Sequence, residues 1–225
     1  VSPRSRADAV DGGEMMIVVG LTGGIASGKS TTASMIRDRG IPVHDADAAV
    51  HELLAPGGGA VGAVAAAFGD DMLAPDGSID RQRLGAAVFS DPALRQALES
   101  IIHPLVAADR DAFLETHRQS GTPVAVLDIP LLFETAGEAL CDFVILCSAA
   151  PEEQRRRALV RAGMTDAKLD AIIASQMPLS DKRRLADAVI DTDHGLAAAR
   201  DALATILDGP VCDLVNATGS DSGNA

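Results

Sequence analysis

One octapeptide near the amino end has the residue types that hold phosphate. The run Gly23-Gly24-Ile25-Ala26-Ser27-Gly28-Lys29-Ser30 fits the pattern G-x-x-x-x-G-K-[ST]. It follows an apolar stretch, 15–21, typical of a buried strand, and it precedes a helical stretch, 31–39. In that setting backbone N–H groups and the helix dipole face an anion, the lysine adds a point charge, and Ser30 offers a hydroxyl to Mg²⁺. The sequence therefore predicts a site for a nucleoside triphosphate.

The pattern is specific because lysine is rare in this chain. Lysine occurs only at 29, 168 and 182. A shuffled chain of the same composition would contain the pattern roughly 0.003 times. A chance glycine-rich turn is therefore the weaker interpretation.

Carboxylates follow two of the predicted strands. Asp45 and Asp47 end the second apolar run, and residues two apart in a strand share a face, so both could point toward the same ligand. One could orient an attacking hydroxyl and accept its proton, or both could belong to a turn and a helix N-cap. The residues leave these interpretations open. Asp128 ends a third apolar strand, the form of an acidic group near Mg²⁺.

Arginines gather in two segments of an otherwise acidic chain. Four lie between 155 and 161, and Lys182-Arg183-Arg184 forms the second group. Arg157 and Arg161 are four apart and are predicted to share a helix face, which costs free energy unless an anion lies there. They predict either a lid that closes on a transferring phosphoryl group or a solvated face with ordinary ion pairs.

The histidines have no metal-ligand spacing with one another or with the cysteines. His44 and His51 are predicted to have surface or packing roles. His103-Pro104 is predicted to end one helix and begin another, where the histidine could face a substrate cleft.

Composition limits the classes of function. The 225 residues are 47% hydrophobic and 23% charged, which is typical of a globular protein, and no apolar stretch is long enough for a membrane span. A net charge of −13 argues against binding to nucleic acid or to an anionic membrane. Three cysteines without a C-x-x-C pair predict reduced thiols in a cytoplasmic protein, and the acidic surface predicts a monomer.

Strand-like and helical stretches alternate along the chain. The alternation predicts an α/β fold with a parallel five-stranded sheet flanked by helices. The predicted strands are 15–21, 42–46, 123–128, 142–147 and 187–191, and Gly195–Leu207 is predicted to be the last helix. Asp91-Pro92 is predicted to be an N-cap followed by proline at the first helical position, and Pro151 with Glu152 and Glu153 is predicted to open another helix. The domain is predicted to span 15–208, with core segments 15–47, 121–150 and 187–208, a helical insertion at 48–120 and a lid at about 151–182. Residues 1–14 and 209–225 are predicted to be a disordered extension and tail.

Taken together, these segments resemble the dephospho-CoA kinase family, over about residues 16–208. The matching segments are 20–25, 27–31, 45–47, 79–81, 102–105, 128–134, 154–161 and 186–191. The phosphate loop and the Pro-Leu-Leu-Phe-Glu run at 130–134 are its most specific parts. The resemblance implies a P-loop NTPase core like that of nucleoside-monophosphate kinases, with a CoA-binding helical insertion and a lid. It also implies ATP and Mg²⁺ as cofactors and dephospho-CoA as the substrate.

The resemblance implies roles for matched positions. Asp47 would accept the proton of the ribose 3′-hydroxyl of dephospho-CoA, with Arg81 and His103 on the CoA side. Ser30 would ligate Mg²⁺, and Lys29 and Arg157 would act directly in the transfer. The residues implied to hold ATP are Gly23, Ala26, Ser27, Gly28, Lys29, Ser30, Thr31, Arg157 and Arg161.

Two positions depart from the family pattern. Ala26 stands where the family usually has glycine, and a methyl group there is expected to require a negative φ. Thr192 stands where the family often has asparagine, so the adenine pocket is not assigned.

Two other functions remain as alternatives. Another small-molecule kinase of the same fold would share the phosphate loop and differ in its acceptor. A nucleotide-dependent switch is the alternative from another class. The chain lacks the Asn-Lys-x-Asp of guanine recognition, and Asp128 is followed by Ile129 and not by the glutamate of a motor ATPase.

Overall fold

The computed structural model describes residues 16–221, so the predicted extension at 1–14 lies outside the described residues. The chain divides into two compact units. The first contains the described residues before His44 and those from His117 onward, and the second is His44–Thr116.

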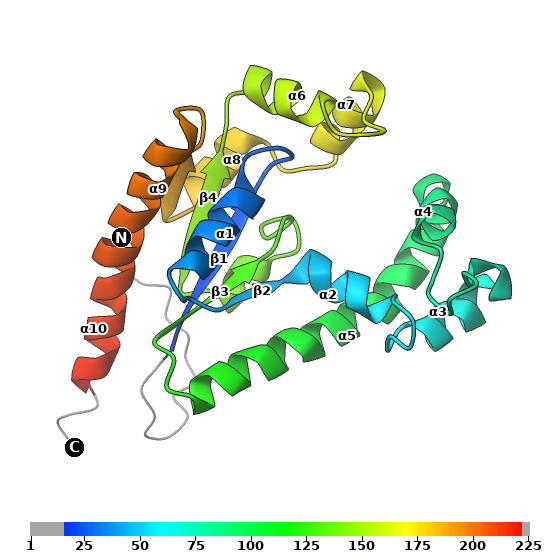
Figure 1. Cartoon of the computed structure of the whole chain (residues 1–225), viewed down its shortest axis with the longest axis horizontal. Coiled ribbons are helices and arrows are strands. Elements are labelled where there is room, and N and C mark those ends of the chain that lie inside the picture. Colours follow the sequence, from blue (N-terminus) through cyan, green and yellow to red (C-terminus); the bar gives the residue numbers. More distant parts are fainter. Residues whose placement is uncertain (1–15, 222–225) are drawn as a thin grey trace. The chain divides into compact units, whose positions relative to one another are not determined.

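The first unit is built on a five-stranded parallel sheet (Figure 1). The strands are β1 (Ile17–Gly23), β2 (Val43–Asp45), β3 (Val124–Asp128), β4 (Phe143–Ser148) and β5 (Ala188–Asp191), in the order β2-β3-β1-β4-β5. Leu21 of β1 is in register with Asp128 of β3, and Gly23 with Cys147 of β4. The predicted fold class and all five strands are confirmed, within two residues at each end.

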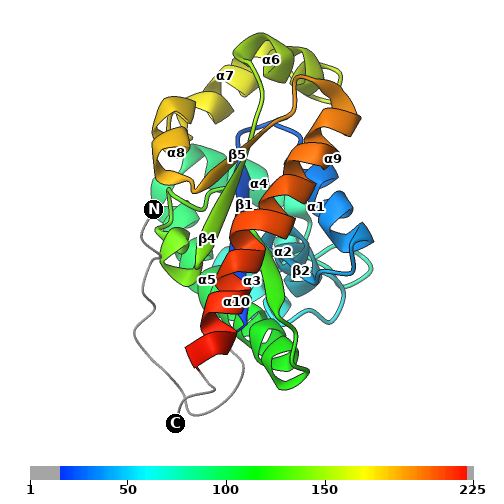
Figure 2. The same cartoon turned by 90° about the vertical axis from the view of Figure 1, so that its left-hand side faces the viewer.

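The strand β1 is buried along its whole length because both faces of the sheet are covered. Figure 2 shows α1 (Lys29–Asp38) and α9 (Gly195–Ile206) on one side of the strands and α8 (Leu179–Leu185) on the other. Side chains of α1 and α9 pack with β1 and β4 in the main hydrophobic core, which includes Ile36, Ile145 and Leu203. This core fixes the end of β1 from which the phosphate loop leaves.

Two helices follow the carboxyl end of β4 (Figure 1). Helix α6 (Pro151–Leu159) begins as predicted, with proline in its first turn followed by Glu152 and Glu153. Helix α7 (Asp166–Ala174) is capped by Thr165, whose hydroxyl accepts a hydrogen bond from the Lys168 N–H. Both helices lie in the predicted lid segment.

The carboxyl-terminal segment differs from the prediction. After α9 the chain continues through a π-helical turn, η3 (Leu207–Val211), into α10 (Cys212–Asp221). The predicted disordered tail at 209–225 is therefore helical as far as Asp221, and Gly195–Leu207 is not the last helix. Leu207 and Val211 are buried in the main core, and this packing supplies stability that local composition does not reveal.

The second unit is helical and has a core of its own. Its elements are α2 (Ala46–Leu53), α3 (Val61–Phe68), the 3₁₀ turn η1 (Asp70–Met72), α4 (Arg81–Ser90) and most of α5 (Pro92–Gln119). Val64, Ile79 and Ile102 are among the side chains buried in this core. Most of the predicted insertion, 48–120, lies in this unit.

Helix α5 confirms one prediction and contradicts another. Asp91 accepts hydrogen bonds from the N–H groups of Ala93 and Leu94, as its predicted N-cap position requires. His103 and Pro104, however, lie inside this single helix and do not separate two helices. An interior proline removes one backbone hydrogen bond, and the helix tolerates this cost because Ile102 beside it is buried in the core.

No helix within residues 16–221 is long and apolar enough to cross a membrane.

Candidate nucleotide site

The phosphate loop joins β1 to α1 at the carboxyl edge of the sheet. Gly23 is the last residue of β1, and Lys29, Ser30 and Thr31 form the first turn of α1. Gly28 caps the helix with φ of 88°, a left-handed conformation that favours glycine. A Cβ atom there would also lie 2.9 Å from the Thr192 methyl group. Strand, loop and helix are thus arranged as an anion cradle requires.

Ala26 contradicts the expectation of a negative φ. Its φ is 56°, in the left-handed region that alanine adopts at a cost. The methyl group is buried and packs with Ala158 of α6 and Leu169 of α7. This packing offsets part of the backbone strain and links the phosphate loop to helices α6 and α7.

Lys29 is paired with the acidic residue at the end of β3. Its Nζ lies 2.5 Å from Oδ1 of Asp128, whose side chain is only 2% exposed. A carboxylate so deeply buried needs a cation beside it. The pair holds the ammonium group of Lys29 at the end of β3, beside the phosphate loop.

Two glutamines from the lid segment also meet the phosphate loop. The Ile25 N–H donates to Oε1 of Gln176 over 3.3 Å. A Cβ atom on Gly24 would lie 3.1 Å from Nε2 of Gln154. Gln176 therefore satisfies a loop N–H of the kind that a phosphate oxygen can accept from.

Arg157 in the last turn of α6 is fixed by three hydrogen bonds. Its Nε donates to Glu153 over 2.6 Å, while Nη1 and Nη2 donate to the hydroxyl and carbonyl oxygens of Thr192 over 2.9 and 2.8 Å. Hydrogen bonds from Arg156 and Arg157 lower the pKa of the Glu153 carboxyl group to about 2. Arg157 therefore has an ionised partner at neutral pH.

Arg161 does not share a helix face with Arg157, although the sequence predicted that it would. Helix α6 ends at Leu159, and Arg161 is an exposed residue of the turn that follows. Because the helix ends before Arg161, the four-residue spacing on which the prediction depended no longer places the two side chains on one face.

Three other arginines of the two clusters make ordinary ion pairs. Arg155 binds Asp166 and Asp170 of α7, and Arg156 binds Glu153. Arg184 pairs with Asp181 in the same helix. For these arginines the interpretation as a solvated face is correct.

Lys182 is a buried residue with a structural partner. Its Nζ lies 2.8 Å from Oε1 of Glu134, the last residue of the Pro-Leu-Leu-Phe-Glu run, and the lysine side chain is 1% exposed. Burial raises the pKa of the Glu134 carboxyl group, but the Lys182 cation beside it and a hydrogen bond from the Met177 N–H outweigh this effect, and the pKa is lowered. The pair joins α8 to the segment that follows β3.

The two carboxylates after β2 separate into different elements of structure. Asp45 ends the strand and accepts a hydrogen bond from the Ala48 N–H, which makes it the N-cap of α2. Asp47 is an exposed residue in the first turn of that helix. They do not share a strand face, so the predicted geometry was wrong and the N-cap interpretation holds for Asp45.

The other acceptor-side candidates are also exposed residues of the helical unit. Arg81 is the first residue of α4, directly after its N-cap Asp80, and His103 lies in α5. His44, by contrast, is buried, with Nε2 2.8 Å from Asp109 Oδ2 and its ring against Phe113. The predicted packing role of His44 is confirmed.

Oxygen atoms at the mouth of the loop suit a magnesium–nucleotide complex. The Ser30 hydroxyl is exposed at the start of α1, and the Asp128 carboxylate lies beside Lys29. Mg²⁺ prefers few protein oxygens together with water and substrate phosphates. In the described part of the chain no group of three or more His, Cys, Asp or Glu residues could hold a metal by itself.

The cysteines in the described residues are all free thiols. Cys141 and Cys147 are buried and Cys212 is exposed. Burial raises the pKa of the Cys147 thiol to about 12, so this group next to the phosphate loop is a packing residue and not a nucleophile.

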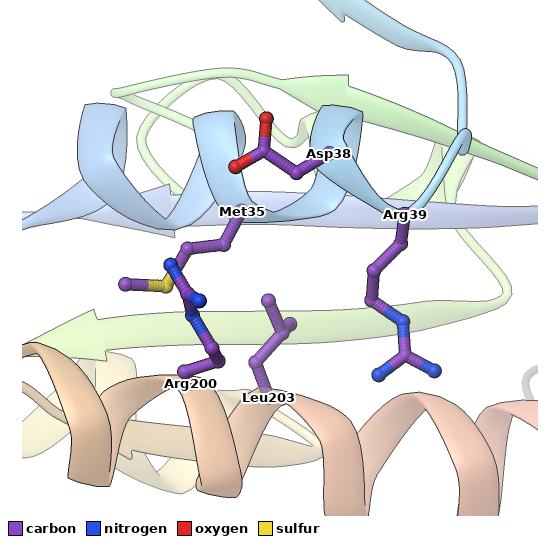
Figure 3. A pocket seen from close by; sticks show the side chains of 5 residues that line it. All are labelled: Met35, Asp38, Arg39, Arg200 and Leu203. Carbon is purple, nitrogen blue, oxygen red and sulfur yellow. The ribbon is translucent and has the colours of Figure 1, made fainter.

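A pocket of about 230 Å³ lies between α1 and α9 (Figure 3). Figure 3 shows it lined by Met35, Asp38, Arg39, Arg200 and Leu203. It opens beside the carboxyl end of α1, whereas the phosphate loop is at the amino end of that helix. It is therefore separate from the nucleotide site.

Sequence reasoning missed Gln176 and the contacts of Thr192. Thr192 directly follows β5, so the rule that ligands bind beyond the carboxyl ends of parallel strands could have identified it. Gln176 follows α7 without any local motif, and only the folded chain brings it to the loop.

A five-stranded parallel sheet of this order, with a phosphate loop after β1 and a lysine–aspartate pair at its mouth, defines a P-loop kinase-like protein. Comparison with known proteins makes the class specific. The dephospho-CoA kinase family model matches residues 17–198. A dephospho-CoA kinase of Mesorhizobium japonicum is 54% identical over 193 residues, which are 86% of this chain and 96% of that relative.

Solved structures agree with this result. A crystal structure from Thermus thermophilus is similar with a TM-score of 0.75 and 32% identity, over 88% of this chain and 98% of that one. A dephospho-CoA kinase from Campylobacter jejuni shares the fold, with a TM-score of 0.60 and 22% identity over 85% and 95% of the two chains. The chain belongs to the dephospho-CoA kinase family, a family of nucleotide-using kinases, which confirms the predicted resemblance.

Proposed function

We propose that this chain transfers the γ-phosphoryl group of ATP to the ribose 3′-hydroxyl of dephospho-CoA, giving CoA and ADP, the last step of coenzyme A synthesis. Family membership over residues 17–198 supports the reaction. The single structural observation that carries it is the Lys29–Asp128 pair at the mouth of the phosphate loop. This pair supplies a cation for the β- and γ-phosphates at the place where the loop N–H groups converge.

The nucleotide side is assigned to the loop and the lid. Residues 26–31 would hold the ATP phosphates through backbone N–H groups, and Lys29 would neutralise charge on the transferring group. When the phosphates bind, the Lys29 ammonium group would interact with their oxygen atoms as well as with Asp128. Arg157 would add a guanidinium from the lid, with Arg161 as a second lid cation. The lid excludes water, so ATP is not hydrolysed without the acceptor.

Magnesium would be held by Ser30 together with the nucleotide phosphates. When bound, the ion spreads the negative charge that builds on the phosphoryl oxygens. The exposed hydroxyl of Ser30 at the start of α1 fits this role.

The acceptor side is assigned to the helical unit. Asp47 would orient the 3′-hydroxyl and take its proton as the new oxygen–phosphorus bond forms and the bond to ADP breaks. The exposed carboxylate in the first turn of α2 is compatible with this role. Arg81 and His103 would contact the CoA portion of the substrate.

We further propose that the chain is a monomer in the cytoplasm. Because its net charge is −13, copies of the chain repel one another, which supports a monomer. Light scattering coupled to gel filtration would give the mass of one chain, and the mass of two would contradict the monomer.

ADP release in a coupled assay tests the function. Three acceptors are compared in the presence of ATP and Mg²⁺: dephospho-CoA, AMP and adenosine. Turnover with dephospho-CoA alone is the expected result. Turnover only with AMP or adenosine would assign another acceptor to the same phosphate loop, and tight ATP binding without turnover would favour a switch.

A further inference from the structure

Thr192 connects three parts of the nucleotide site. It is the first residue after β5, and it is buried. Its N–H donates to the Ser148 carbonyl oxygen at the end of β4 over 2.8 Å. The backbone of this residue therefore continues the sheet pairing by one position, which fixes where its side chain begins.

The Thr192 hydroxyl group uses both its donor and its acceptor capacity. It donates its hydrogen toward the carbonyl oxygens of Ser27, 2.9 Å away, and Ser148, 3.1 Å away. It accepts a hydrogen bond from Nη1 of Arg157 over 2.9 Å. One oxygen atom thus links the phosphate loop, the end of β4 and the lid arginine.

The remaining contacts of Thr192 make this link rigid. Its carbonyl oxygen accepts from Nη2 of Arg157 over 2.8 Å, so the guanidinium group binds the residue through both terminal nitrogens. Its methyl group lies close to Gly28: a Cβ atom placed on Gly28 would be 2.9 Å from that methyl group. The residue is therefore packed directly against the turn that begins α1.

The guanidinium of Arg157 keeps donors for a ligand in this arrangement. Of its five N–H groups, one binds Glu153 and two bind Thr192. One N–H on each terminal nitrogen remains. Because the plane of the group is fixed, these two donors have a set direction relative to the Ser27 carbonyl and hence to the loop.

We propose that Thr192 is a positioning residue for phosphoryl transfer, which acts through Arg157 by holding its guanidinium group in register with the phosphate loop. The proposal rests on the proposed role of Arg157 toward ATP. The Thr192 hydroxyl group supplies both the donor and the acceptor that the link needs. A group held in place before ATP binds loses less freedom when the transition state forms.

Valine and serine substitutions separate the hydroxyl group from the shape of the side chain. Thr192→Val keeps the shape and removes the link, and it is expected to lower kcat about tenfold. Thr192→Ser keeps the hydroxyl and is expected to stay within about threefold of the wild type. Thr205→Val is the matched control, because the exposed Thr205 hydroxyl donates only to the Asp201 carbonyl in α9. It should leave kcat unchanged.

A double-mutant cycle with Arg157→Ala tests whether Thr192 acts through that residue. In the Arg157→Ala background, Thr192→Val should cost less than about twofold in kcat, because the group it positions is gone. The dissociation constant of ATP, measured by calorimetry without any acceptor, should show the same coupling. An independent tenfold loss in that background would overturn the proposal, as would full activity of Thr192→Val.

A second pair of variants and a binding measurement without acceptor keep the test decisive. If Thr192→Val does not fold, Thr192→Ser and Thr192→Ala form a second pair that differs only in the hydroxyl group. The calorimetric cycle needs no acceptor, so it stands even if the wild type does not phosphorylate dephospho-CoA. In that case the proposed function fails while coupling between Thr192 and Arg157 is still measured.

Discussion

The unit built on the sheet and the helical unit, 44–116, hold their candidate functional groups in different ways. In the sheet unit Lys29 is paired with a buried carboxylate, and Arg157 is fixed by Glu153 and Thr192. In the helical unit Asp47, Arg81 and His103 are exposed on helices.

The proposed function explains this difference by the charge that each unit would bind. A triphosphate carries concentrated charge, and cations fixed before it arrives need not be reorganised when the transition state forms. The proposed acceptor is a larger molecule with one reacting hydroxyl, and exposed polar groups on the helical unit would suit it. In the proposed function, the sheet unit would thus carry the phosphate chemistry and the helical unit would recognise the acceptor.

Among the substitutions that test this comparison, Lys29→Met should have the largest effect on kcat. Loss of the fixed charge is expected to lower kcat by about 10²–10³, corresponding to about 3–4 kcal/mol of barrier. Steady-state assays with saturating ATP measure it. Lys168→Met in α7 removes an exposed lysine and serves as the control. An equal loss of kcat in the two variants would show that Lys29 has no special role in catalysis.

Lys182→Met should destabilise the sheet unit by about 3 kcal/mol, because it leaves the partly buried Glu134 carboxylate without its cation. The double variant with Glu134→Gln should recover part of this loss in urea unfolding. No recovery would show that the pair is not what holds α8 to the segment that follows β3.

The Glu134 carboxyl group makes the stability of the folded chain depend on pH. Its folded pKa lies below the ordinary value of 4.5, so its contribution to stability is present above that pH. Stability should therefore fall as the pH drops below about 4.5, through the folded pKa. In Glu134→Gln this part of the acid dependence should be absent when unfolding is followed against pH.

Asp47→Asn is expected to lower kcat by about 10², while the dissociation constant of ATP stays the same. Asp45→Asn is the matched control, because asparagine also caps helices and the same charge is lost two residues away. A kcat within about threefold of the wild type for Asp47→Asn would exclude its role as the base.

The smallest effect compares two alanines with the same unusual backbone. Ala26 and Ala136 have φ of 56° and 53°, but only Ala26 is buried. Ala136→Gly should stabilise the chain by about 0.5 kcal/mol, since relief of strain exceeds the entropy that glycine loses. Ala26→Gly should stabilise the chain by about 0.8 kcal/mol less than Ala136→Gly does, because the substitution also removes a methyl group that packs with Ala158 and Leu169. Equal changes in thermal unfolding would mean that the methyl group contributes nothing to lid packing.

The sequence predicted the sheet unit well, because its signals are local. Apolar runs mark strands buried on both faces, and the glycine-rich pattern before Lys29 rarely arises by chance in a chain with so few lysines. The N-cap at Asp91 and the start of α6 at Pro151 were predicted from single residues with known capping preferences.

The incorrect predictions have tertiary causes. The strand before Asp47 ends two residues earlier because Asp45 caps α2. Pro104 stays inside α5 and α10 forms after α9, because each segment packs against a core that local composition does not show. The left-handed Ala26, the Gln176 contact and the Thr192 link depend on segments that are distant in sequence.

The central claim is most directly tested by the position of the new phosphate in the product. Dephospho-CoA is incubated with the wild-type chain, ATP and Mg²⁺, and the product is examined by mass spectrometry and phosphorus NMR. The account predicts the gain of one phosphoryl group, attached to the ribose 3′-oxygen, together with an equal amount of ADP. Unchanged dephospho-CoA, or a phosphoryl group on another oxygen, would contradict it.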